Sequence, residues 1–122
     1  MPAIGSAPGS DHQETLFMAT APFYRVDKFI VPDAARQAFI DAVDETDAVM
    51  RTQPGFVRHD LLEQVGGPGE YNFVTVAEWE SDEVIPIVAA AIARHQAKRR
   101  FDRNAFFATH GIRADIATYR VL

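Results

Sequence analysis

Two short motifs constrain the fold of this chain more than any other feature. The first, Gln53-Pro54-Gly55-Phe56, follows a helical pattern and opens a segment typical of a strand. The second, Trp79-Glu80-Ser81, ends a strand pattern and is followed by acidic residues that suit the start of a helix. Proline and glycine interrupt regular structure, and serine is a favoured helix N-cap. The first motif therefore marks the start of one strand and the second marks the end of another, and together they predict a hairpin between Phe56 and Trp79.

Aromatic and β-branched residues concentrate in four segments, which predicts four strands. These segments are residues 23–31, 56–65, 71–80 and 112–122. Apolar residues at helical spacing predict one helix over residues 34–51 and another that begins at Pro86 or one turn earlier. Residues 101–111 are expected to add a short helix or a helical extension. The resulting order, βαββαβ, predicts a ferredoxin-like α+β fold with a four-stranded antiparallel sheet.

Length and composition limit the class of protein. The 122 residues suit one domain, and we expect a mobile leader over residues 1–21 before a folded domain over residues 22–122. The net charge of −5 argues against a nucleic-acid partner. No apolar run approaches the roughly 20 residues that cross a bilayer, and no secretory signal is evident, so no membrane partner and a cytoplasmic location are expected. The chain has no cysteine, which excludes thiolate chemistry.

The predicted strands are apolar on both faces. In the third strand, Phe73, Ala77 and Trp79 point one way, whereas Val74 and Val76 point the other way. Two helices cover only one face of a four-stranded sheet. We therefore expect a homodimer that forms through the sheet faces, since a twofold-related copy is the commonest partner. The alternative is a monomer whose N-terminal leader folds over the second face.

Residues 23–122 resemble the antibiotic biosynthesis monooxygenase family. The resemblance is carried by Phe29-Ile30-Val31-Pro32, Pro54-Gly55-Phe56 and Trp79-Glu80-Ser81-Asp82-Glu83 in that order and spacing. It implies a dimeric α/β barrel in which each subunit keeps a pocket between its sheet and its helices. Some members of the family oxidise aromatic polyketides to quinones with O₂ and without metal, flavin or haem, whereas others degrade haem. The resemblance thus implies no cofactor and a small aromatic ligand.

The resemblance also implies roles for individual residues. Trp79 matches a functional tryptophan of the quinone-forming members, and Thr75 takes the place of their asparagine. Their functional arginine falls on Arg99, with Arg100 beside it. In the haem-degrading members, an asparagine of the first strand matches Asp27, but their helical tryptophan has no counterpart here. Haem degradation is therefore not expected.

The residues themselves leave alternatives open. Trp79 is either a core aromatic or a pocket wall whose indole N–H orients a substrate oxygen. His95 is the best candidate for a general base if it faces the sheet, and His59 is a strand histidine of the surface or the core. Arg99 and Arg100 either end a solvated helix or hold a phenolate. No helical His-x-x-x-His pair is present, so no metal site is expected.

The resemblance implies a cofactor-independent monooxygenase that oxidises a small aromatic or phenolic substrate with O₂. The expected catalytic residues are His95, Trp79 and Arg99, and the expected substrate-binding residues are Thr75, Asp27, His59 and Arg100. The alternative is a non-catalytic module of the same fold that binds a small molecule. A third hypothesis is a structural dimer whose apolar side chains fill the space over the sheet and leave no pocket.

Overall fold

The structure is a computed structural model that describes residues 21–122, so all but the last residue of the predicted leader lies outside the described residues. The strands are β1 (Phe23–Ile30), β2 (Phe56–Glu63), β3 (Phe73–Trp79) and β4 (Arg113–Tyr119). The helices are α2 (Arg36–Met50), α3 (Ile85–Lys98) and α4 (Arg103–His110), and two 3₁₀ turns, Asp33–Ala35 and Asp82–Val84, precede α2 and α3.

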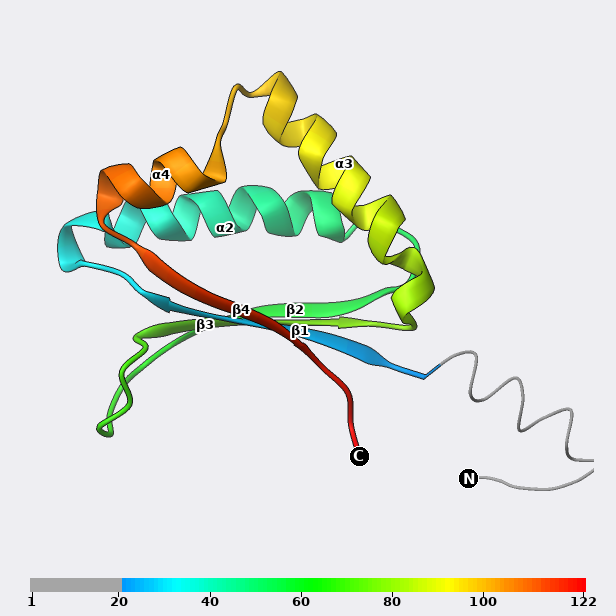
Figure 1. Cartoon of the computed structure of the whole chain (residues 1–122), viewed down its shortest axis with the longest axis horizontal. Coiled ribbons are helices and arrows are strands. Elements are labelled where there is room, and N and C mark those ends of the chain that lie inside the picture. Colours follow the sequence, from blue (N-terminus) through cyan, green and yellow to red (C-terminus); the bar gives the residue numbers. More distant parts are fainter. Residues whose placement is uncertain (1–20) are drawn as a thin grey trace, which may run out of the picture.

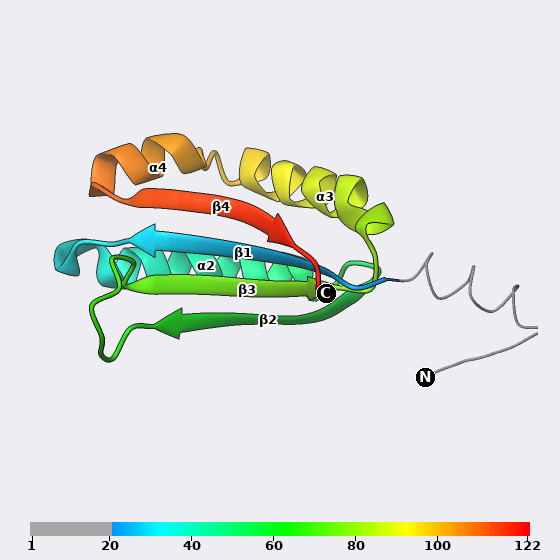
Figure 2. The same ribbon diagram turned by 60° about the horizontal axis from the view of Figure 1, so that its bottom comes forward.

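The four strands form one antiparallel sheet in the order β2-β3-β1-β4. All three helices lie on one face of this sheet, with α2 over its middle and α3 and α4 above the β4 side (Figures 1 and 2). Strand β1 is central because it pairs with both β3 and β4. The predicted ferredoxin-like α+β fold is therefore confirmed, and residues 101–111 contain the separate short helix α4.

Local signals explain where the elements begin and end. Pro54-Gly55 follows the end of α2 and prevents the helix from continuing. Gly55 adopts a positive φ of 78°, which glycine allows without strain. The Ser81 side chain accepts a hydrogen bond of 3.3 Å from the backbone N–H of Glu83 and so caps the turn before α3. Pro86 lies in the first turn of α3, where its missing N–H is tolerated. Helix α4 begins after Asp102, whose side chain caps Ala105.

The apolar side chains between the sheet and the helices form two clusters. One contains Phe29, Phe39 and Phe73, with the rings of Phe29 and Phe39 in an edge-to-face arrangement at 4.9 Å. The other contains Met50, Trp79 and Val88. Trp79 packs edge-to-face against Phe56 with ring centroids 5.6 Å apart. Such aromatic packing stabilises a core beyond its buried area. Residues of both clusters also line the cavity described below.

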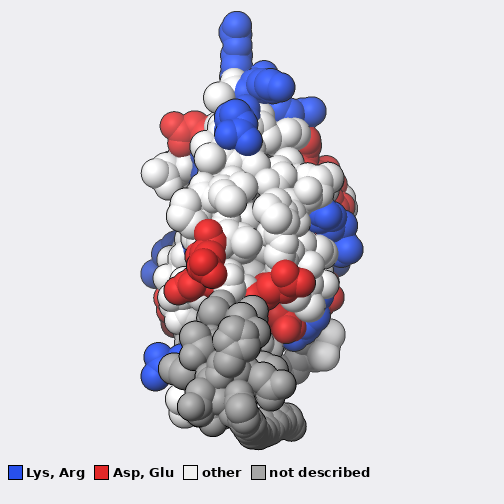
Figure 3. All heavy atoms as spheres, turned by 90° about the vertical axis from the view of Figure 1, so that its right-hand side faces the viewer, with Lys and Arg blue, Asp and Glu red and all other residues white. Residues whose placement is uncertain are grey.

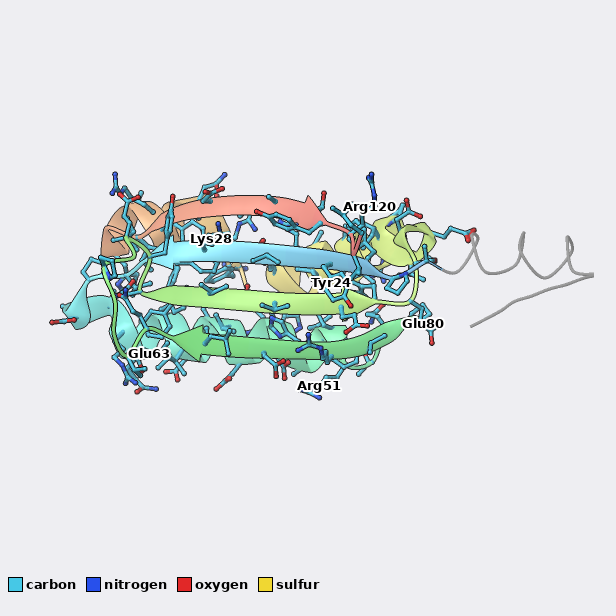
Figure 4. The ribbon with its side chains drawn as sticks, turned by 90° about the horizontal axis from the view of Figure 1, so that it is seen from below. Tyr24, Lys28, Arg51, Glu63, Glu80 and Arg120 are labelled. Atoms are coloured by element: carbon cyan, nitrogen blue, oxygen red, sulfur yellow. The ribbon has the colours of Figure 1, made fainter. Side chains whose placement is uncertain are left out.

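The opposite face of the sheet carries no helix in the described part of the chain, as the view from below shows (Figure 4). The Tyr24 and Lys28 side chains of β1 lie on this open face, with Val74 and Val76 of β3 beside them. Tyr119 of β4 is opposite Tyr24 in the register and is 45% exposed. The open face therefore carries the apolar Val74 and Val76, as the sequence predicts, but also polar side chains such as Lys28. None of the helices formed by residues 21–122 is long and apolar enough to cross a membrane.

Candidate functional site

A cavity of about 630 Å³ lies between the sheet and the helices. Its floor comes from β1, β2 and β3, and its walls come from α2, α3 and the segment that begins α4. The apolar stripe predicted for α3, which consists of Ile85, Val88, Ala89 and Ile92, forms one wall. A cavity of this volume is typical of small-molecule sites. The hypothesis of a closed apolar core without a pocket is therefore wrong.

Strand β1 places a charged pair inside this largely apolar cavity. Its alternation directs Arg25 and Asp27 towards the helices, between Phe23 and Phe29. The Arg25 guanidinium donates a hydrogen bond of 2.8 Å to the Asp27 carboxylate. Burial raises the pKa of Asp27, although Arg25, Arg103 and His59 oppose this effect by favouring the charged carboxylate. The pair thus gives the cavity a polar centre.

His59 on β2 joins the same cavity from the other side. Its side chain is only 7% exposed, and its Nδ1 lies 2.9 Å from Oδ1 of Asp47 on α2. The other Asp47 oxygen accepts a hydrogen bond of 2.7 Å from Nε of Arg51. Partial burial acts to raise the pKa of Asp47, but the hydrogen bonds from Arg51 and His59 outweigh it and hold this pKa below its ordinary value.

Two further polar groups line the cavity from β3. Trp79 is 2% exposed and Thr75 is 7% exposed, and both contribute to the lining. Within residues 21–122, neither the indole N–H of Trp79 nor the hydroxyl of Thr75 has a hydrogen-bond partner. Buried polar groups are nearly always hydrogen-bonded in folded proteins. These two groups are therefore candidates for hydrogen bonds to a molecule that occupies the cavity.

A sequence profile of the family described as antibiotic biosynthesis monooxygenase matches residues 22–103, about two thirds of the chain. The chain belongs to this family. Among curated proteins, no sequence matches it.

Solved structures agree with this membership at the level of the fold. SnoaB, a cofactor-independent oxygenase from Streptomyces nogalater, is 20% identical and superposes with a TM-score of 0.62, over 84% of this chain and 94% of SnoaB. The heme-degrading protein Rv3592 from Mycobacterium tuberculosis is 23% identical, with a TM-score of 0.55 over 84% of this chain and 93% of that protein. PA3566 from Pseudomonas aeruginosa is 16% identical, with a TM-score of 0.58 over 85% and 97%.

In this member of the antibiotic biosynthesis monooxygenase family, one cavity is lined by four of the site residues that the sequence predicts. They are Asp27, His59, Thr75 and Trp79. Asp27 is directly opposite Thr75 in the pairing of β1 with β3, and His59 is opposite Ala77, the neighbour of Thr75 on the same face. The alternation of the strands thus brings together residues that are far apart in the sequence. Their roles stay predictions.

The other three predicted residues do not line the cavity. Glu45 on α2 binds His95 through Nε2 at 3.1 Å and Arg99 through Nη2 at 3.1 Å. Arg100 has a φ of 53° and is exposed in the turn after α3. Figure 3 shows Lys and Arg side chains gathered at the tip of the molecule, where α3 ends. The placement of His95 as a base that faces the sheet is therefore corrected, because the residue is held on the α2 side of α3 by Glu45.

The structure adds Arg25, Asp47 and Arg103 to the candidate residues. Arg103 lines the cavity because the turn at Arg100 redirects the chain, so that α4 begins over the sheet. In residues 21–122, Arg103 forms no ion pair, and its guanidinium lies 5.8 Å from the ring of Phe107. The basic run Lys98-Arg99-Arg100 predicts a positive charge near the start of α4, but it does not indicate which arginine lines the cavity. Among the residues described, no three carboxylate or histidine side chains converge as a metal site would require.

Proposed function

We propose that this member of the family is a cofactor-independent monooxygenase that oxidises a small phenolic or related aromatic substrate with O₂ inside the cavity. One observation carries this proposal. Trp79 and Thr75 contribute a buried indole N–H and a buried hydroxyl to the residues that line the cavity, and neither group has a hydrogen-bond partner in the described part of the chain. An aromatic molecule with an oxygen substituent satisfies both the apolar walls and these donors.

The proposed reaction converts an activated CH₂ or aromatic C–H beside a phenolic system into a carbonyl. For an anthrone, R₂CH₂ and O₂ give R₂C=O and H₂O, so the carbon loses four electrons and O₂ gains them. One oxygen atom enters the product and the other leaves as water. The protein has to remove a proton first, because the resulting electron-rich anion is the species that reduces O₂. Positioning and electrostatic stabilisation of this anion are the tasks of the site.

The side chains that line the cavity suit these tasks. Trp79 and Thr75 donate hydrogen bonds to the substrate oxygen, as the family resemblance suggests for Trp79. Arg103, a cation on the wall opposite β1, stabilises the negative charge of the anion. This role replaces the one expected for Arg99 and Arg100, which lie outside the cavity lining.

We also propose that the functional unit is a homodimer in which a second copy covers the open sheet face. Val26, Val74 and Val76 lie together on this face, and Tyr24 and Tyr119 pair beside them. A group of apolar side chains on an open sheet face is normally covered in a soluble protein. The cavity lies on the opposite face, so each copy keeps its own site.

O₂ uptake by the purified protein, measured against a panel of dihydroxynaphthalenes and anthrones, tests the proposed function. We expect uptake above the uncatalysed rate, accompanied by the quinone product, and a clear reduction in Trp79→Phe. Quenching of the fluorescence of Trp79, the chain's single tryptophan, reports binding independently. Absence of uptake with every compound that quenches this fluorescence would contradict the proposal.

A binding module without catalysis is the second candidate function. It is favoured by Thr75, which replaces the asparagine that resemblance to the quinone-forming members leads one to expect. The threonine hydroxyl has a shorter reach than an amide and cannot offer its two separate donors. Ligand binding with unchanged O₂ concentration, in the wild type and in Thr75→Asn alike, is the result that this candidate predicts.

A further inference from the structure

The two nitrogen atoms of the His59 ring have different surroundings. Nδ1 is bound to Asp47, whereas the ring as a whole lines the cavity and 93% of the side chain is buried. No hydrogen bond joins Nε2 to another residue between positions 21 and 122. His59 is therefore a buried polar side chain with one nitrogen committed to the protein and the other left for the cavity.

Asp47 fixes which nitrogen of His59 carries the proton. An ionised carboxylate only accepts hydrogen bonds, so Nδ1 has to be the donor in the neutral ring. Nε2 then holds the lone pair and is the basic atom. Arg51 donates to the other oxygen of Asp47 at 2.7 Å and helps to keep that carboxylate ionised and in place. A histidine oriented by a carboxylate in this way is a recurring arrangement for general bases.

We propose that His59 is the general base of the site and that Asp47 is its positioning residue. This inference rests on the proposed function, for which it names the proton acceptor. In the step, the C–H or O–H bond of the substrate breaks and an Nε2–H bond forms, while the electron pair stays on the substrate as the anion. The imidazolium is stabilised by Asp47. It later returns its proton to the oxygen atom that departs as water, which restores the neutral ring.

The charged groups around His59 are consistent with this role. Asp47 contacts it from α2 and is itself bonded to Arg51, which follows that helix. Arg25 and Asp27 belong to β1, and Asp102 and Arg103 line the cavity where α4 begins. The lining contributed by α3 carries no charged side chain. Asp47 favours the imidazolium directly, while Arg103 is available for the substrate anion on the other side. The site thus separates a place for positive charge from a place for negative charge.

The other acid–base groups are weaker candidates on geometric grounds. Asp27 faces the cavity, but its Oδ1 already accepts a hydrogen bond of 2.8 Å from the Arg25 guanidinium, so this carboxylate is engaged within the protein. His95 lies outside the cavity lining and is bound to Glu45 through Nε2. His59 is the one histidine among the cavity-lining residues.

The test uses the purified full chain with 1,8-dihydroxyanthrone under strictly anaerobic conditions near neutral pH. The anion of this probe absorbs at longer wavelength than its neutral form, so the spectrum reports proton removal without any turnover. Trp79 fluorescence reports binding in the same sample. The variants are His59→Gln, Asp47→Asn and, for the competing candidate, His95→Gln. Asp47→Asn keeps an oxygen that can accept from Nδ1, so it removes the charge with little change in shape.

We expect the wild type to convert bound probe into its anion. His59→Gln should lose this band, and Asp47→Asn should reduce it about tenfold, because the neutral amide neither fixes Nδ1 as the hydrogen-bond donor nor offers a negative charge to the imidazolium. A merely structural role of Asp47 would change binding rather than the ratio of anion to neutral probe. Near-UV and far-UV circular dichroism identifies any variant that fails to fold, and the remaining variant then decides.

Three results would overturn the inference. They are a full anion band in His59→Gln, loss of the band in His95→Gln with retention in His59→Gln, and a wild type that binds the probe without forming its anion. Admitting air afterwards tests the proposed function separately. If the anion forms through His59 but no O₂ is consumed and no quinone appears, His59 is a base and the protein is not a monooxygenase for this probe class.

Discussion

The backbone N–H of Glu80 donates a hydrogen bond of 2.8 Å to the carbonyl oxygen of Gly55. This bond joins the two motifs that dominate the sequence, and Phe56 packs edge-to-face against Trp79 beside it. Gly55 has a positive φ, and a Cβ atom built on it would lie 2.9 Å from Cγ1 of Val84. The turn after α2 and the turn before α3 are therefore packed against each other at the Trp79 end of the cavity.

Gly55→Ala should destabilise the protein by about 1–3 kcal/mol, because it combines an unfavourable φ with a close contact to Val84. Chemical denaturation measures this change in the free energy of unfolding. The double variant Gly55→Ala with Val84→Ala relieves the contact but not the φ, so it separates the two causes. Gly66→Ala is the matched control, since no atom lies within 4 Å of its added Cβ and its φ is not positive. An equal effect at both glycines would contradict this explanation.

Replacing Asp47 by asparagine should make stability less dependent on acid. The pKa of Asp47 is lowered in the folded protein, so its carboxylate stabilises the fold above its ordinary pKa of 3.8, and this contribution is lost as the pH falls through the lowered value. Near neutral pH we expect Asp47→Asn to cost about 1–2 kcal/mol through the weakened bonds to Arg51 and His59. Thermal unfolding of both proteins over a pH series is the measurement. The difference between them should shrink at the acid end of the series.

Asp27 should show the opposite dependence. Burial raises the pKa of Asp27, so the folded state binds its proton more tightly than the unfolded state does. Between the ordinary value of 3.8 and the raised value, this residue therefore makes the fold more stable as the pH falls. Asp27→Asn removes this gain and should lose more stability on acidification than the wild type. Parallel slopes for the two proteins across this window would show that Asp27 is not perturbed by burial.

Trp79→Phe should leave the fold intact and weaken aromatic ligands. Phenylalanine keeps most of the contact with Phe56 but has no N–H, so a substrate oxygen loses one donor, at a cost of about 1 kcal/mol or more. Calorimetric titration with 1,8-dihydroxyanthrone and with anthracene compares ligands with and without oxygen. The variant should lose affinity for the first and keep its affinity for the second. Equal losses would assign Trp79 a packing role alone.

Val76→Asp should convert the proposed dimer into a monomer. Val76 lies on the open sheet face between Val26 and Asp60, and a charge in a buried interface there would have no partner. Light scattering coupled to size-exclusion chromatography measures the mass. Ile87→Asp, on the exposed side of α3, adds the same charge elsewhere and should leave the mass unchanged. A monomeric wild type would contradict the proposed dimer directly.

The fold was predictable because local signals mark its boundaries. Pro32, Pro54 and Pro86 restrict the backbone, Ser81 caps the turn before α3, and the segments between them show clear strand or helix periodicity. The structure shortens all four predicted strands, since β1 ends at Ile30, β2 ends at Glu63, β3 covers Phe73–Trp79 and β4 covers Arg113–Tyr119. At these ends of the segments, backbone pairing with the neighbouring strand stops before the apolar pattern in the sequence does.

The site was predictable only where strand alternation decides the direction of a side chain. Thr75 and Trp79 are four residues apart in β3 and therefore lie on the same face of the sheet. Asp27, on the neighbouring strand β1, is paired with Thr75 and lies on that face as well. The direction of His95 depends on which neighbour binds it, and Glu45 comes from another helix. The pairing of His59 with Asp47 depends in the same way on how α2 rests on β2. Contacts of this kind are set by tertiary packing and leave no periodic trace in the sequence.

Strand β1 is bonded along both edges, and it carries the Arg25–Asp27 pair into the cavity. These two charges are therefore attached to the least adjustable part of the sheet, whereas the opposite walls come from helices that pack through side chains. Any molecule that enters the cavity has to match the fixed Arg25–Asp27 pair, whereas the helical walls can change to accommodate the rest of the molecule. Among relatives with different substrates, divergence is then expected on the inner sides of α3 and α4, with β1 serving as the common reference against which each new cavity is shaped.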